Sequence, residues 1–231
     1  MAGEHLCCGL LEEARFTLGR MQNPVRGFLH GSAAVAALAG SIALVLRIPS
    51  LGGRLAAAVF GLGMVALYTT SSLYHSIPWQ ELWKKRMKRL DHSMIFVLIA
   101  GTYTPIVWIT LSGTLRLMSL LVVWTIAAIG IGQQAFFPRD KGNFAIALMT
   151  SLGWLGVFIV FPLTKQAGVV AAALLAVGGI LYTVGMVFLV TNRPRLWPRV
   201  FSYHELFHVM VVTATSLHFM ATWRYVAPLA A

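Results

Sequence analysis

Two histidines and a glutamate open the last long apolar segment of the sequence, in "SYHELFH" from Ser202 to His208. Helix residues four positions apart have Cβ atoms about 5 to 6 Å from each other, so His204 and His208 can point at the same ion. His75, at the end of another apolar segment, offers a third neutral imidazole. Zinc bound by three protein nitrogens keeps a fourth tetrahedral position for water, which is typical of a catalytic site. The pKa of that water falls to about 7, so hydroxide is available at neutral pH.

Acidic residues are scarce, and only two of them lie at or within apolar segments. The sequence has seven, namely Glu4, Glu12, Glu13, Glu81, Asp91, Asp140 and Glu205. Ionisable groups inside a membrane span are costly and by default mark a functional site. We expect Asp91 to act as a general base or to orient the water. We expect Ser71, one turn before His75 in "SSLYH", to donate a hydrogen bond to a substrate carbonyl or a developing oxyanion.

Each of these assignments has a simpler alternative. The HxxxH spacing is a weak signal for a metal by itself, because a membrane histidine is usually a hydrogen-bonded packing residue. Asp91 could form a solvated ion pair with Lys88 or Arg89 at the membrane interface. The Ser71 hydroxyl could bond back to a carbonyl of its own helix.

The other polar residues of the apolar segments are interpreted as structural. Packing roles are assigned to three further histidines, namely His30, His92 and His218. His92 points about 100° away from its neighbour Asp91, and His218 lies near the opposite leaflet. Glu205 lies about 100° round the helix from His204, so we expect it to reach the basic loop before this helix and to have no catalytic role.

These side chains must be positioned by membrane-spanning helices. Of the 231 residues, 58% are hydrophobic and 11% are charged, whereas globular proteins have about 45 to 50% apolar and about 25% charged residues. Apolar runs of about 17 to 25 residues, the length of a transmembrane helix, recur along the chain. They predict an all-α integral membrane protein, a seven-transmembrane-helix bundle. The predicted spans are 27–46, 55–75, 91–111, 115–133, 144–163, 169–190 and 201–223.

Basic residues gather in the loops on one side of this bundle. Thirteen of the 18 Lys and Arg residues fall in the N-terminal segment and in the second, fourth and sixth loops. Short loops rich in Lys and Arg stay on the cytoplasmic side, so we expect a cytoplasmic N-terminus. His75, Asp91, His204 and His208 then share one depth near the cytoplasmic leaflet. The net charge of +11 is interpreted as a topology signal that contacts anionic lipid headgroups, and no nucleic-acid partner is expected.

The N-terminal segment, residues 1–26, precedes the seven-helix domain of residues 27–231. Its stretch "HLCCGLLEEARFTL" alternates apolar and polar residues at near-helical spacing, which favours an interfacial helix on the inner leaflet. Cys7 and Cys8 are adjacent and are the only cysteines, so we expect no structural disulfide. Palmitoylation of this pair is an alternative role.

Three motifs together resemble the progestin and adipoQ receptor (PAQR) superfamily, specifically its bacterial hemolysin III branch. They are "SSLYH" at 71–75, "LDHSMIFVLIAGTYTP" at 90–105 and "HELFH" at 204–208, in the family's order. The resemblance implies a seven-helix protein of the bacterial inner membrane. It also implies a zinc ion held by His75, His204 and His208, with Asp91 and Ser71 beside it. Adiponectin receptors of this superfamily hydrolyse ceramide, whereas the name of the bacterial branch implies cytolysis.

The leading hypothesis is a zinc-dependent hydrolase that cleaves a lipid amide or ester, ceramidase-like, at the cytoplasmic leaflet and contributes to membrane lipid homeostasis. Pro105 in "GTYTP" removes one hydrogen bond from the third helix, which we expect to loosen that helix for sideways lipid entry. Two alternatives stay open. One is a non-enzymatic, zinc-stabilised membrane sensor or receptor-like protein. The other is a cytolytic pore, which a single bundle with polar groups at one leaflet supports least.

Overall fold

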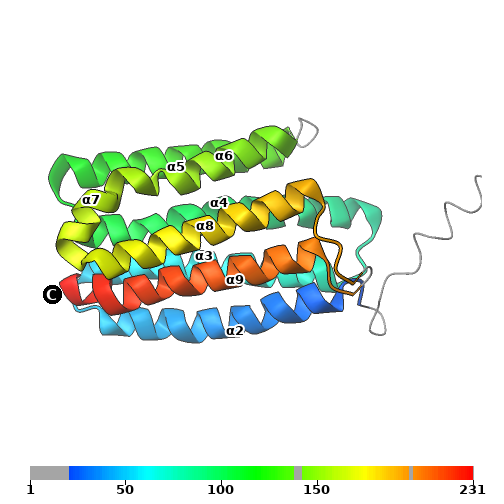
Figure 1. Cartoon of the computed structure of the whole chain (residues 1–231), viewed down its shortest axis with the longest axis horizontal. Helices are drawn as coiled ribbons and strands as arrows, with labels where there is room; N and C mark the ends of the chain where they lie inside the picture. Colours follow the sequence, from blue (N-terminus) through cyan, green and yellow to red (C-terminus); the bar gives the residue numbers. More distant parts are fainter. Residues whose placement is uncertain (1–20, 138–141, 198–199, 231) are drawn as a thin grey trace, which may run out of the picture.

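The computed structural model describes residues 21–137, 142–197 and 200–230, and these residues form a bundle of nearly parallel helices (Figure 1). Within these ranges no strand is found beyond an isolated bridge between Trp197 and Phe201. Seven helical segments are long and apolar enough to cross a membrane, which confirms the predicted number of spans. The predicted interfacial helix with Cys7 and Cys8 lies outside the described residues, and the cytoplasmic orientation of the N-terminus stays a prediction.

The helices follow the predicted spans in order. They are α2 (Pro24–Arg47), α3 (Leu51–Ser76), α4 (Glu81–Thr110), α5 (Gly113–Phe136), α6 (Gly142–Trp154), α7 (Gly156–Ala167), α8 (Val169–Thr191) and α9 (Tyr203–Ala221). Helices α6 and α7 together form the fifth span, and a π-helical turn (Thr222–Val226) and a 3-10 turn (Ala227–Ala230) extend the seventh. Neighbours in sequence pack against each other, and α2 also packs against α9. The first and last described helices therefore lie side by side (Figure 1).

Helix α4 is the central helix of the bundle. Within its most apolar stretch 67% of the residues are buried, against 22% or less in α2, α5, α8 and the fifth span. Its Leu98 joins the core formed with α2, α3 and α9, and its Phe96 and Val107 join a second core with α5 and α6. The less buried helices expose apolar faces, which is the expected surface for a protein surrounded by lipid.

Small residues let the first helices approach closely. A Cβ atom on Gly61 of α3 would lie only 2.5 Å from the Cβ atom of Ser41 on α2, so only glycine fits at this crossing. Such contacts between small residues are typical of helix pairs in membranes, where close backbone approach replaces the hydrophobic driving force. This packing holds α3 firmly against α2 along the length of both helices.

Helix α4 begins at Glu81, ten residues before the predicted start of the third span at Asp91. The predicted span covers only the apolar part of α4, because "ELWKKRMKRL" is too polar for a hydropathy scan, although its residues are good helix formers. An ion pair between Lys85 and Glu81, 2.9 Å apart at i,i+4 spacing, supports this first part of the helix. Asp91 therefore lies in the third turn of a long helix.

The fifth span, predicted at 144–163, is present but is divided at Leu155 between α6 and α7. The hydroxyl oxygen of Tyr103 on α4 lies 2.7 Å from the carbonyl oxygen of Gly153 and 3.0 Å from that of Leu152. It satisfies carbonyl groups that the break releases, and this matters because lipid offers them no partner. Gly168, with φ of 87°, then turns the chain from α7 into α8.

Candidate metal centre

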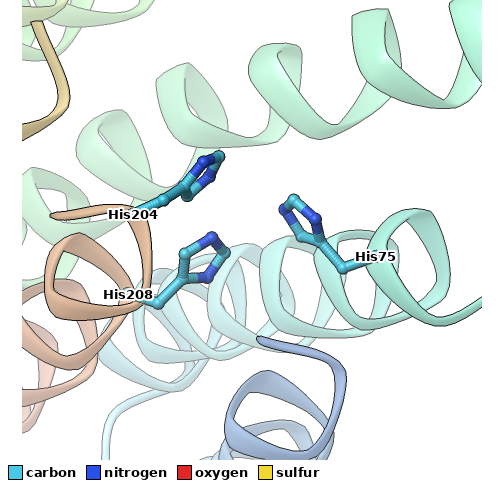
Figure 2. Close-up of side chains that lie close together, drawn as sticks. All are labelled: His75, His204 and His208. Carbon is cyan, nitrogen blue, oxygen red and sulfur yellow. The ribbon is translucent and has the colours of Figure 1, made fainter. Parts of the chain in front are cut away.

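Three histidine rings meet at the end of the bundle where α3 ends and α9 begins (Figure 2). His75 comes from the last turn of α3, and His204 and His208 come from the first two turns of α9. One ring nitrogen from each lies within 4.8 Å of the others, close enough for one ion to contact all three. His75 and His208 are only 4% and 3% exposed. The structure thus brings together the three residues that the sequence predicted as metal ligands.

The rings are arranged around a common volume. Those of His204 and His208 are nearly parallel, at 23° with centroids 5.1 Å apart, as expected for neighbouring turns of one helix. The ring of His75 stands edge-on to both, with centroids 5.3 Å from His204 and 4.9 Å from His208. Metal–nitrogen bonds of about 2.0 to 2.1 Å to zinc are compatible with these separations after small ring movements. Three neutral imidazoles suit zinc and also copper, iron and nickel, so the donor set fits a transition metal without selecting one.

Backbone and capping contacts position the two helix ends that carry these rings. The backbone N–H of Asn23, just before α2, donates to the carbonyl oxygen of His75 at 3.0 Å. At the start of α9, a carboxylate oxygen of Glu205 accepts a hydrogen bond of 2.8 Å from the backbone N–H of Ser202. This capping contact satisfies one of the free N–H groups at the start of the helix. It fixes the first turn, on which His204 lies.

Ser71 on α3 and Asp91 on α4 lie together, and Ser71 is one turn before His75. Ser71 and Asp91 are 2% and 7% exposed, and the Ser71 side chain lies beside the Asp91 carboxylate. The ion pairs found among the described residues do not include Asp91, so the alternative of a solvated pair with Lys88 or Arg89 is wrong. Asp91 is not one of the three clustered groups, and its catalytic role stays a prediction.

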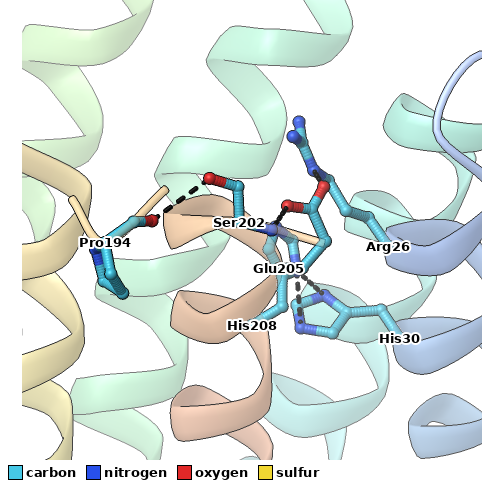
Figure 3. Close-up of polar contacts among 6 residues, drawn as sticks. All are labelled: Arg26, His30, Pro194, Ser202, Glu205 and His208. Atoms are coloured by element: carbon cyan, nitrogen blue, oxygen red, sulfur yellow. Dashed lines mark hydrogen bonds and ion pairs between the residues drawn. The ribbon is translucent and has the colours of Figure 1, made fainter. Parts of the chain in front are cut away.

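Two residues of α2 join the site, and sequence reasoning gave neither of them this role (Figure 3). His30 Nε2 lies 2.9 Å from Nδ1 of His208, and Arg26 Nε donates to Glu205 Oε1 at 2.7 Å. The expectation that Glu205 reaches the sixth loop was therefore wrong. One signal of these contacts was available in the spacing. Arg26 and His30 are four residues apart on α2, and Glu205 and His208 are three residues apart on α9. Each pair therefore lies on one face in the first two turns of its helix.

The remaining histidines differ in their surroundings. His218 Nε2 lies 3.1 Å from the carbonyl oxygen of Leu175, and its ring packs on Tyr182 with centroids 5.6 Å apart. This agrees with the predicted packing role. His92 lies near enough to interact electrostatically with His75 and His204, although it is not part of the cluster.

Comparison with known proteins places this site in a family. A family model described as haemolysin-III related matches residues 19–219, which include His75, His204 and His208. The chain is 34% identical to hemolysin-3 of Bacillus cereus over 204 residues, covering 87% of this chain and 90% of that protein. It is 35% identical to the hemolysin-3 homolog of Bacillus subtilis (strain 168) over 167 residues, covering 72% and 75%. It is also 24% identical to the human monocyte to macrophage differentiation factor over 204 residues, covering 86% and 82%. The chain is thus a multi-pass membrane protein that belongs to the haemolysin III-related family.

Proposed function

We propose that this protein is a zinc-dependent hydrolase that cleaves a lipid amide or ester at the cytoplasmic leaflet and so contributes to membrane lipid homeostasis. The convergence of His75, His204 and His208 from two helices carries the proposal. Buried ionisable side chains are costly within a membrane and are kept for a function. Three neutral nitrogen donors, with a carboxylate and a hydroxyl on adjacent helices, form the set of groups that metal-assisted hydrolysis needs.

When bound by three imidazoles, zinc activates water at neutral pH and polarises a carbonyl oxygen. In this reaction Asp91 takes a proton from the attacking water and returns it to the leaving amine or alcohol, so that a carbon–oxygen bond forms as the amide or ester bond breaks. The Ser71 hydroxyl donates a hydrogen bond to the substrate carbonyl oxygen as negative charge develops there. The position of Ser71 beside Asp91, one turn from His75, supports this division of roles.

The surroundings of the cluster favour a lipid as the substrate. The outer faces of the bundle expose large apolar side chains, among them Leu82 and Trp83 at the start of α4 and Leu73 near the end of α3. Such apolar faces are in contact with lipid tails, which supports a lipid as the molecule that approaches the bundle from the side. Helix α4 runs without interruption through Pro105, and the loosening expected from this proline is part of the proposal.

The buried hydroxyl groups of the bundle support an enzyme over a pore. The name hemolysin-3 refers to lysis, which would require a polar path through the membrane. Several buried hydroxyls instead donate to carbonyl oxygens of their own helices, including those of Ser41, Thr102, Thr110 and Thr222. A hydroxyl used in this way has no remaining hydrogen to donate to water.

Lipid turnover by purified protein of known metal content tests the proposal. The full chain is reconstituted in liposomes that contain ceramide or an ester phospholipid, and free fatty acid is followed by mass spectrometry. We expect Asp91→Asn to keep the metal and to lose about 10²- to 10⁴-fold in rate, the usual contribution of a general base. Ser93→Ala is the matched control, because Ser93 is a buried α4 residue whose hydroxyl bonds to its own helix.

The control variant should turn over lipid at the native rate with the native metal content. If metal is retained but neither the native protein nor Asp91→Asn cleaves any amide or ester lipid, the hydrolase is rejected. A metal that stabilises the bundle without turnover would then favour the non-enzymatic sensor.

A further inference from the structure

Helix α2 contributes no residue to the histidine cluster, yet it contacts both helices that do. On the α3 side, the backbone N–H groups of Gln22 and Asn23 donate to the carbonyl oxygens of Ser76 and His75 at 3.3 and 3.0 Å. One turn along α2, the Ser72 hydroxyl donates to the Gly27 carbonyl oxygen at 2.8 Å. These contacts fix the start of α2 relative to the turn that carries His75.

On the α9 side, two polar contacts one turn apart fix α2 relative to His208 (Figure 3). Arg26 pairs with Glu205 at 2.7 Å, and the side chains of this pair are only 18% and 9% exposed. One turn further along both helices, His30 Nε2 lies 2.9 Å from Nδ1 of His208. The ion pair thus sets the register of the two helices, and the histidine contact lies at the level of the cluster.

The His30 ring is itself held in place. It is 2% exposed, and its edge contacts the ring of Tyr68 on α3 with centroids 5.1 Å apart and an interplanar angle of 68°. Its centroid lies 4.1 Å from that of His208. Both nitrogens of this ring face Nδ1 of His208, and Nε2 is the nearer of the two, at 2.9 Å against 3.3 Å for Nδ1. A ring confined between α3 and α9 can act as a supporting residue for a ligand.

Histidines that bind metals almost always donate their other ring N–H to a nearby acceptor, which fixes the tautomer and the ring orientation. We propose that His30 is the positioning residue for His208: its Nε2 accepts a hydrogen bond from the Nδ1–H of His208, which leaves Nε2 of His208 for the metal. The inference rests on the metal binding assumed in the proposed function and does not depend on hydrolysis. Helix α2 then contacts both α3 and α9, the helices that carry the three histidines, and holds them in position relative to each other.

The affinity of the purified full chain for zinc, measured by competition with a chromophoric chelator, tests the inference. His30→Phe keeps a ring of similar size without a nitrogen, and we expect it to weaken zinc binding about 10- to 100-fold, as loss of a supporting partner does. His30→Gln offers an acceptor near the position of Nε2 and should recover most of the loss. His218→Phe removes a half-buried histidine outside the cluster and should leave the affinity unchanged.

Three readouts separate positioning from a general loss of structure. In a His208→Ala background, His30→Phe should cause no further loss of affinity, because His30 acts through His208. Bound cobalt should show a shifted visible absorption spectrum in His30→Phe and a native spectrum in His30→Gln. For the native protein loaded with zinc, imidazole nitrogen NMR should show the proton of His208 on Nδ1, a measurement that needs no variant to fold.

Native affinity in His30→Phe, an equally weak His30→Gln, or a proton on Nε2 of His208 would overturn the inference. If the native protein binds zinc and one of these results is found, the inference fails while the proposed metal site stands. If the native protein binds no metal, the inference and the proposed function fail together.

Discussion

His208 and His218 lie on the same helix, ten residues apart, and have opposite surroundings. The ring of His208 has three other histidine rings within 5.1 Å, two of them from α2 and α3. His218 contacts a backbone carbonyl and a tyrosine ring. His208 is buried, and His218 is half-buried with its Nδ1 atom enclosed, so enclosure of an imidazole nitrogen alone does not make a metal site. A metal site is formed where nitrogen donors converge from helices that are far apart in sequence.

The two regions also differ in how they are held. Polar contacts between α2, α3 and α9 fix the His208 region, including the ion pair of Arg26 and Glu205. In the His218 region, the helices approach closely because Gly178 of α8 faces the histidine ring. The polar contacts there are those of His218 with the Leu175 carbonyl oxygen at 3.1 Å and of Tyr182 with Thr215 at 2.5 Å. The polar contacts around His208 fix the direction of side chains, whereas the glycine near His218 sets the distance between helices.

The largest expected effect is the loss of metal-dependent stability in His75→Ala. A ligand present at about 1,000 times its Kd stabilises the folded state by about 4 kcal/mol. A chelator should therefore lower the thermal unfolding midpoint of the native protein and of His218→Ala by the same amount, and should leave that of His75→Ala unchanged. If the chelator still lowered the unfolding midpoint of His75→Ala, metal binding would not depend on His75. The proposed difference between the His208 and His218 regions would then be contradicted.

Arg26→Gln should have the next largest effect. It leaves the Glu205 carboxylate without its cation, and loss of a charged hydrogen bond costs about 1.5 to 3 kcal/mol. Thermal unfolding measures the cost, and Glu205→Gln in the same chain should recover part of it because the unpaired charge is then gone. If the two single costs simply add in the double variant, the two side chains are not coupled.

Tyr182→Phe affects the His218 region by a smaller amount. It removes the hydrogen bond to Thr215, and the net contribution of such a bond is about 0.5 to 1.5 kcal/mol. We expect a lower unfolding midpoint with unchanged metal content. A loss of metal in this variant would show that the two regions are coupled through the core.

Lys85→Ala should have the smallest effect. The pair of Lys85 and Glu81 is exposed at the start of α4, outside both regions, and solvent screens it. The unfolding midpoint and the metal content should both match the native values. A clear change in either would show that the first turns of α4 support the site.

Hydropathy and spacing were sufficient for the seven spans and for the three clustered histidines. The i,i+4 relation of His204 and His208 is set within one helix, and the rarity of polar residues in the spans pointed to His75 as the third. The start of α4 was missed because a hydropathy scan detects only the part of a helix that crosses hydrocarbon. At the break near Leu155, Tyr103 of α4 contacts the released carbonyl groups, and such a contact follows from tertiary packing.

The roles of Arg26 and His30 could not be predicted for the same physical reason. Their partners, Glu205 and His208, are almost 180 residues away in sequence. Spacing gives the face of a helix on which a residue lies, but the rotation of that helix about its axis depends on which helices surround it. In α2 that rotation is set by contacts with α3 and α9.

Metal analysis of the purified protein tests the central claim most directly. We predict about one transition-metal ion per chain in the native protein and in His218→Ala, and none in the His204→Ala, His208→Ala double variant. A double variant that keeps its metal, or a native protein that binds none after incubation with zinc, would contradict the account.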